Sequence, residues 1–314
     1  MGKIAGKRIW IAGHNGLVGS AMMRRLAREA CDVLTVERSR LDLTRQDDVA
    51  DFLIESRPDA IVFCAARVGG ILANDTEPVP FLLDNLQMAT SVFAAAHAAD
   101  VDRILYLGSS CVYPRDAAQP MAEDALLTGP LEATNQWYAI AKIAGIKLAQ
   151  AYRKQFGRDY VSAMPTNLYG PGDNFDLATS HVLPGLIARI HAAHERGAPS
   201  VPIWGTGTPR REFLHVGDCA DALVCVLRDY SDAMPINIGS GQEISIAELA
   251  ALVAEIVGYR GALVFDSGKP DGTPRKLLDC SRLDALGWRP AIGLREGITA
   301  TYRWYRNTLE RRAA

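Results

Sequence analysis

Several features are missing from this 314-residue sequence, and each absence excludes a class of protein. No apolar run reaches the roughly 20 residues that a membrane-spanning helix needs, so no membrane partner is expected. Residues 1–6 lack the apolar core of a secretory signal peptide. Basic and acidic residues nearly balance, 34 against 36, for a net charge of -2. Without a basic excess, the chain has no general surface for nucleic acid.

The cysteines are few and widely scattered. They are Cys31, Cys64, Cys111, Cys219, Cys225 and Cys280. No two of them have the spacing of a metal site or of a disulfide framework. We therefore predict reduced thiols in a cytoplasmic protein and no bound metal. Most of these thiols are expected to act as small buried hydrophobes.

Apolar runs and amphipathic stretches alternate along the first half of the chain, which predicts a parallel sheet with crossover helices. The expected strands cover residues 8–12, 33–36, 60–66, 104–108 and 160–164. The expected helices cover residues 17–30, 80–99 and 138–156. This is the doubly wound α/β pattern of Rossmann folds, in which ligands bind at the carboxyl ends of the strands.

The alternation of apolar runs and amphipathic stretches becomes less regular after Gly170-Pro171-Gly172, where proline and glycine become frequent. We expect a Rossmann domain over residues 1–170 and a smaller C-terminal lobe over 171–314. Strand-like segments at 213–216 and 236–239 are expected to return to the main sheet, so residues near 213–240 belong to the first domain. In the second lobe, Ser245 and Glu248 have the spacing of a capping box that begins a helix reaching about residue 257. A closing helix is expected over 294–312.

A glycine-rich turn, GHNGLVG at residues 13–19, follows the first strand and precedes the first helix. In a dinucleotide site, Gly13 permits the tight turn and Gly16 lets the pyrophosphate approach the backbone. Gly19 lets the helix pack on the strand, and the helix N-terminus attracts the anion. This spacing resembles that of the extended short-chain dehydrogenase/reductase superfamily.

Tyr138 and Lys142 lie one helical turn apart, on one helix face. An ammonium at that distance is expected to lower the pKa of the phenol and make it a usable acid or base. Upstream, the small residues of GSSC (108–111) end a strand, and the Ser109 hydroxyl can polarise a substrate carbonyl. Together with the glycine turn, these residues predict an enzyme that moves a hydride.

The end of the second strand bears on the cofactor. An acid there binds the ribose 2′-hydroxyl of NAD, whereas an arginine accepts the 2′-phosphate of NADP. Glu37 favours NAD, and Arg38 with Arg40 favours NADP, so two cations against one anion predict NADP(H). Asp42 and Leu43 are expected beside the adenine.

Nearly end to end, the sequence resembles the GDP-L-fucose synthase family, NADPH-dependent 3,5-epimerase/4-reductases of GDP-4-keto-6-deoxy-D-mannose. The matching segments are AARVGGI (65–71), GSSCVYP (108–114), YAIAKIAG (138–145), MPTNLYG (164–170), REFLHV (211–216) and KPDGTPRK (269–276). The resemblance implies epimerisation at C3 and C5, then reduction at C4. Members often carry an arginine where this chain has Asn15, which leaves the 2′-phosphate mainly to Arg38.

The resemblance also implies roles for residues. Cys111 is the epimerisation base and His181 the opposing acid, while Tyr138, Lys142 and Ser109 serve the reduction. The cofactor is expected to contact Gly13, Asn15, Gly16, Leu17, Val18, Gly19, Arg38, Asp42, Leu43, Leu107, Gly108, Lys142, Pro165, Thr166, Asn167, Leu168 and His181.

A substrate diphosphate favours guanidinium groups, because they bond phosphate oxygens in a fork. Arg211 is the first candidate in the second lobe, with Arg189 behind it. Trp204 can contact the nucleotide, and Asp271 or Arg275 its ribose or base. The family resemblance further implies a homodimer formed by the helices at 80–99 and 138–156.

Two other functions remain alternatives. A nucleotide-sugar 4-epimerase or another reductase of the superfamily would need no Cys111–His181 pair, and a dehydratase would want an Asp–Glu pair where Ser110 and Cys111 stand. An NADP-sensing regulator would have no need of the catalytic side chains, all of which this sequence keeps.

Overall fold

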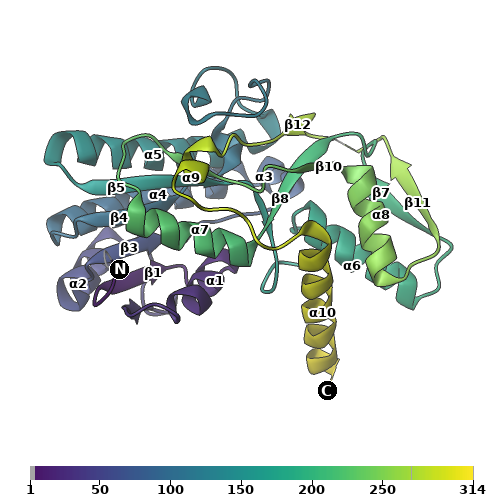
Figure 1. Cartoon of the computed structure of the whole chain (residues 1–314), viewed down its shortest axis with the longest axis horizontal. Helices are drawn as coiled ribbons and strands as arrows, with labels where there is room; N and C mark the ends of the chain where they lie inside the picture. The colour runs from purple at the N-terminus through teal and green to yellow at the C-terminus, as the bar shows by residue number, and fades with distance from the viewer. Residues whose placement is uncertain (1–3, 270, 314) are drawn as a thin grey trace.

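The computed structural model describes residues 4–269 and 271–313, so the first three residues, Pro270 of the KPDGTPRK segment and the last residue lie outside the described residues. Its centre is a six-stranded parallel sheet in the order β2-β1-β3-β4-β5-β9 (Figure 1). The strands are β1 (Arg8–Ala12), β2 (Asp32–Leu34), β3 (Ala60–Phe63), β4 (Arg103–Leu107), β5 (Asp159–Pro165) and β9 (Ile236–Ile238). The doubly wound α/β prediction is confirmed.

Helices cover both faces of this sheet because its strands are apolar on both sides. One face packs against α1 (Leu17–Leu26) and α7 (Val216–Asp229). The other packs against α2 (Gln46–Ser56), α4 (Pro78–Ala98) and α5 (Gln136–Phe156). Successive residues of β1 alternate between the two cores, Ile9 and Ile11 on one side and Trp10 on the other.

The second part of the molecule, at the right of Figure 1, has its own core. Its strands are β6 (Asn167–Tyr169), β7 (Ser200–Trp204), β8 (Arg210–His215), β10 (Glu243–Ser245), β11 (Ala262–Asp266) and β12 (Arg275–Lys276). Its helices are α6 (Val182–Glu195), α8 (Ile246–Val257) and α10 (Leu294–Ala313). The shorter elements of the chain are α3 (Ile71–Thr76), α9 (Ser281–Ala285) and the 3-10 turns η1 (Ser110–Val112), η2 (Glu123–Ala125) and η3 (Ala133–Asn135).

The chain returns from the second lobe to the main sheet through α7 and β9, and β9 pairs with β5. The expectation that residues 213–216 also join that sheet is wrong. Residues 213–215 belong to β8, which pairs with β6, β10 and β12 instead, and Val216 begins α7. The reason is that the chain leaves the main sheet at Thr166, and β8 lies along the diverging strand β6.

Element boundaries differ from the expected ones mainly beside the carboxyl edge. β2 ends at Leu34 and β3 at Phe63, two and three residues early, because the chain turns into loops there. α1 ends at Leu26, and α4 and α5 each begin two residues earlier than expected.

The capping box is confirmed: the Ser245 hydroxyl accepts from the Glu248 backbone, and the Glu248 carboxylate accepts from the Ser245 backbone. Among the described residues, no helix is both long and apolar enough to cross a bilayer.

Packing of α5 on the sheet depends on a glycine. A Cβ atom at Gly145 would lie too close to the ring and hydroxyl of Tyr106 on β4. Tyr106 has no room to move, since its ring is buried against Phe63 and Phe93, with centroids 5.3 and 5.6 Å away.

We therefore expect Gly145→Ala to lower the free energy of unfolding by about 2 kcal/mol through overpacking. This outweighs the roughly 1 kcal/mol by which alanine favours a helix over glycine. Urea unfolding followed by circular dichroism measures the change. Adding Tyr106→Phe should recover part of the loss, because it removes the hydroxyl oxygen, one of the two Tyr106 atoms nearest the new methyl group. A neutral or stabilising Gly145→Ala would show that the interface is looser than the structure indicates.

Candidate active site

One cavity of about 720 Å³ lies where the carboxyl ends of the parallel strands face the second lobe. All the candidate site residues named from the sequence line it except Glu37, Arg40 and Arg275. They are Gly13, Asn15, Gly16, Leu17, Val18, Gly19, Arg38, Asp42, Leu43, Leu107, Gly108, Ser109, Cys111, Tyr138, Lys142, Pro165, Thr166, Asn167, Leu168, His181, Arg189, Trp204, Arg211 and Asp271. These residues span most of the chain, so the fold alone brings them together.

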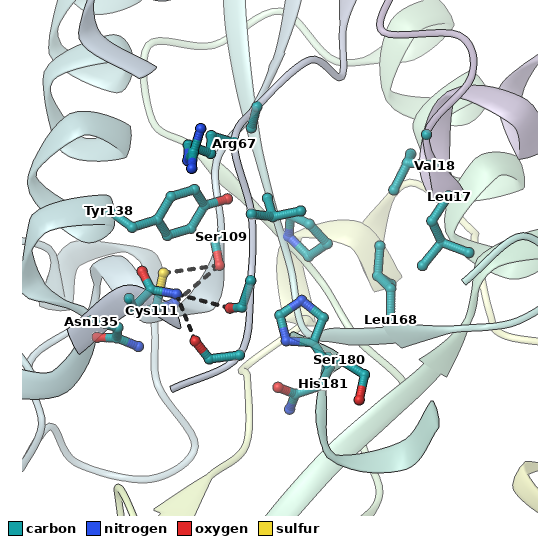
Figure 2. Close-up of a pocket in the computed structure, with 18 of the residues that line it drawn as sticks. Leu17, Val18, Arg67, Ser109, Cys111, Asn135, Tyr138, Leu168, Ser180 and His181 are labelled. Atoms are coloured by element: carbon teal, nitrogen blue, oxygen red, sulfur yellow. Dashed lines mark hydrogen bonds between the residues drawn. The ribbon is translucent and has the colours of Figure 1, made fainter. Parts of the chain in front are cut away.

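The end of β4 presents a hydroxyl and a thiol side by side. Ser109 caps the short turn η1, and its oxygen accepts from the Cys111 backbone at 3.4 Å and from the Cys111 thiol at 3.1 Å. Cys111 is only 7% exposed, yet it lines the cavity. The two side chains can therefore reach the same small group on a bound molecule (Figure 2).

Tyr138 and Lys142 project from the first two turns of α5. The Lys142 ammonium donates to the Leu107 carbonyl at 2.6 Å and lies 5.7 Å from the centre of the Tyr138 ring. Burial lowers the pKa of Lys142 to about 8. The expected lowering of the tyrosine pKa is wrong for this structure: burial, with smaller contributions from Cys111 and Tyr106, raises the pKa of Tyr138. The phenol is therefore held in its protonated form.

His181 precedes α6 and faces Cys111 and Tyr138 across the cavity (Figure 2). Its ring is open to the cavity, but protein surrounds that cavity on most sides. The loss of hydration lowers the pKa of His181. Thiol and imidazole thus stand on opposite walls, as an acid and a base acting on two faces of one sugar ring would require.

The glycine turn suits a dinucleotide. A Cβ at Gly19 would collide with the backbone of Gly13 and His14, so the turn can close this tightly only with glycine. Helix α1 begins without a side-chain cap and without an acidic residue in its first turn. Its unpaired N–H groups therefore remain available for a pyrophosphate at the positive end of the helix dipole.

The far end of the cavity carries the residues expected around the adenosine. Arg38, Asp42 and Leu43 line it, whereas Glu37 and Arg40 lie outside. Two hydrogen bonds from Thr44, with a smaller contribution from Arg38, lower the pKa of Asp42. The Glu37 carboxylate accepts a hydrogen bond from the Asn15 amide at 2.8 Å.

In the second lobe, pairing of β12 with β8 places Lys276 beside Arg211. Neighbouring residues of a strand point to opposite faces. Arg211 and Lys276 consequently line the cavity, while Arg210 and Arg275 turn away and bind Glu243 at 2.9 and 2.7 Å. Burial lowers the pKa of both cavity cations, to about 10 for Arg211.

Lys276 therefore lines the cavity, although the sequence assigned it no role. The neighbouring candidate, Arg275, does not line the cavity. Glu132 was also missed: it is 7% exposed, lines the cavity and accepts from Thr273 at 3.3 Å. Lys276 stands at the end of the quoted KPDGTPRK segment. Only its alternation with Arg275 along a strand could have identified it, and a two-residue strand is too short to recognise.

Trp204 has cations on its ring, with Arg189 at 5.3 Å and Lys269 at 5.5 Å from the centroid. Its indole is 43% exposed and lines the cavity. The Asp271 carboxylate accepts from the backbone and hydroxyl of Thr206 at 2.8 and 2.9 Å. Asp271 therefore also fixes the loop that carries Trp204.

Comparison with known proteins agrees with this geometry. Residues 9–239 match the family described as NAD dependent epimerase/dehydratase. GDP-L-fucose synthase of Sinorhizobium fredii is 57% identical over 95% of each chain, and that of Escherichia coli is 50% identical over 97% of this chain and 98% of its own. The structure of a GDP-L-fucose synthetase from Naegleria fowleri bound to NADP is 27% identical, with a TM-score of 0.89 over 99% of this chain and 97% of its own. The chain therefore belongs to the NAD-dependent epimerase/dehydratase family and, within it, to the GDP-L-fucose synthases.

Proposed function

We infer that this chain epimerises C3 and C5 of GDP-4-keto-6-deoxy-D-mannose and then reduces C4 with NADPH, giving GDP-L-fucose. One observation of the structure carries the argument: Cys111 and His181 face each other across the same cavity that holds Ser109, Tyr138 and Lys142. An enzyme that only reduces, or that epimerises C4 alone, needs no such second pair. The membership of the chain in the GDP-L-fucose synthases agrees with both halves of the reaction.

For epimerisation we propose Cys111 as base and His181 as acid. A 4-ketone acidifies the C–H bonds at C3 and C5, because the carbanion left after deprotonation is stabilised as an enolate. The thiolate sulfur removes a proton from one face of the ring, and the imidazolium returns one to the other. The Ser109 hydroxyl, already beside Cys111, then hydrogen-bonds the C4 oxygen as negative charge develops there.

For reduction we propose that Tyr138 donates its proton to the C4 oxygen. Burial keeps the phenol protonated, as a proton donor must be. NADPH, when bound, supplies the hydride. Lys142 holds the end of β4 through the Leu107 carbonyl and can bond the ribose beside the nicotinamide. The glycine turn, Arg38, Asp42 and the backbone at 165–168 are the residues proposed to hold the rest of the cofactor.

The substrate diphosphate is assigned to the cations of the second lobe. Arg211 and Lys276 line the cavity side by side, and Arg189 stacks on Trp204. The nucleotide would lie along Trp204, with Asp271 near its ribose. In this arrangement residues 1–170 with the returning segments near 213–240 hold the cofactor, and the remainder of 171–314 holds the substrate.

A homodimer in the cytoplasm is also proposed. α4 and α5 pack against each other and leave large apolar side chains in solvent, among them Leu83, Ile140 and Phe156 at 40 to 48% exposure. A second copy of these two helices would cover that surface. The cytoplasmic location is supported by the six unpaired cysteines.

The activity is tested by mixing the protein with GDP-4-keto-6-deoxy-D-mannose and NADPH in deuterated water. We expect NADPH absorbance to fall and mass spectrometry to find two deuterons fixed on carbon in the product. Oxidation of NADPH without deuterium on carbon would mean a simple reductase. If neither change occurs, the 4-epimerase alternative takes precedence.

Two variants should separate the halves of the reaction. Cys111→Ser is expected to lower solvent exchange of the C3 and C5 protons at least about 100-fold, since it removes the base, while NADPH binding stays intact. Tyr138→Phe should keep the exchange and lose NADPH oxidation by a similar factor. Normal exchange in the first variant, or normal reduction in the second, would remove that residue from the proposed mechanism.

The protonation of His181 can be followed directly by NMR, with its imidazole signal assigned by its loss in His181→Asn. Because desolvation disfavours the cation, we expect the titration midpoint to lie below 6.5, so that the protonated fraction rises as the pH falls toward it. A His181 midpoint above 7 would contradict the solvent-poor environment.

A further inference from the structure

Glu37 occupies the point that decides which dinucleotide this fold accepts. It follows the second strand, where the ribose 2′ position is bound in Rossmann folds. Its carboxylate is tied to the glycine turn: one oxygen accepts from the Asn15 amide at 2.8 Å, and the other lies 3.2 Å from the His14 ring nitrogen. Both partners line the cavity, so Glu37 is held at its edge.

The charges around this point balance. Arg38 lines the cavity, and among the described residues no side chain makes a hydrogen bond or ion pair with its guanidinium. Asp42 lies on the same wall and interacts with Arg38 through space. Counting Glu37 and the exposed Arg40 beside it, two cations meet two anions. A 2′-phosphate carries about -1.5 to -2 charges, and this surface lacks the positive excess that would select it strongly.

The 2′-hydroxyl of NADH, by contrast, finds a hydrogen-bond acceptor at this point. A carboxylate has about four lone-pair sites, so Glu37 can keep its bonds to Asn15 and His14 and still accept a hydroxyl proton. Asn15, by donating to the carboxylate, orients it before any ligand arrives. Arg38 remains free for a phosphate. The same site thus offers one partner to each cofactor.

We propose that Glu37, oriented by Asn15, makes this chain accept NADH alongside NADPH and discriminate only weakly between them. The proposal rests on the proposed function and adds to it the residue that sets cofactor specificity. Glu37 favours NADH by accepting its 2′-hydroxyl and disfavours NADPH by repelling the 2′-phosphate. Removing the charge of Glu37 alone therefore shifts the preference toward NADPH.

Isothermal titration of NADPH and of NADH into the purified protein measures this without turnover. For the unaltered chain we expect the two dissociation constants to lie within about tenfold, as expected when charges in an exposed site nearly cancel. Glu37→Gln should change their ratio about tenfold in favour of NADPH, roughly threefold from each cofactor. Arg38→Gln should shift it in the opposite direction.

Glu55→Gln is the matched control, because Glu55 is an exposed carboxylate on α2 that does not line the cavity. It removes the same charge and should leave the ratio unchanged. The inference is overturned if NADH binds more than about 1000-fold weaker than NADPH, or if Glu37→Gln behaves like Glu55→Gln. Neither result affects the proposed function, which fails if NADPH is not consumed with GDP-4-keto-6-deoxy-D-mannose or if no deuterium is fixed on carbon.

Discussion

The hydrogen bond from the Lys142 ammonium to the Leu107 carbonyl joins helix α5 to the end of strand β4. Ser109 and Cys111 come two and four residues after Leu107, and Tyr138 lies one helical turn before Lys142. This single contact therefore sets the position of the phenol relative to the hydroxyl and the thiol. Gly145, three residues after Lys142 in the same helix, allows the close approach of α5 to Tyr106 on β4. The packing of α5 on β4 therefore also fixes the relative positions of the candidate catalytic side chains.

Burial gives the cavity its chemical character. It raises the pKa of Tyr138 and lowers the pKa values of Lys142, His181 and Lys276. Each shift favours the neutral form of its group, because charge is poorly solvated there. The interaction with Cys111 opposes the lowering of the pKa of both lysines. In a site of this kind the uncharged forms of acidic and basic groups are favoured. The charge of a bound substrate then influences their protonation states.

Strand alternation organises the second lobe in a comparable way. β8 and β12 each carry two consecutive cations, and in each strand one faces the cavity while the other binds Glu243. The outward pair anchors the small sheet, and the inward pair is the one to which we assign the substrate diphosphate. Glu132 belongs to the first domain and accepts a hydrogen bond from Thr273 of the second lobe. It adds a buried carboxylate between the two parts of the chain. In each strand, the cation that binds Glu243 and the cation that lines the cavity are therefore adjacent in the sequence.

The sequence by itself determined the fold class, the glycine turn, the Tyr138–Lys142 pair and the Ser109–Cys111 strand end. These signals are local: each depends on spacing within one turn or one strand. Strand periodicity also predicted β1, β3, β4 and β5, although their ends were displaced where loops enclose the cavity. Only the tertiary structure decided that β8 leaves the main sheet, that Lys276 rather than Arg275 faces the cavity, and that the pKa of Tyr138 rises. Those outcomes depend on strand pairing and burial, which involve residues far apart in the chain and are set only once it is packed.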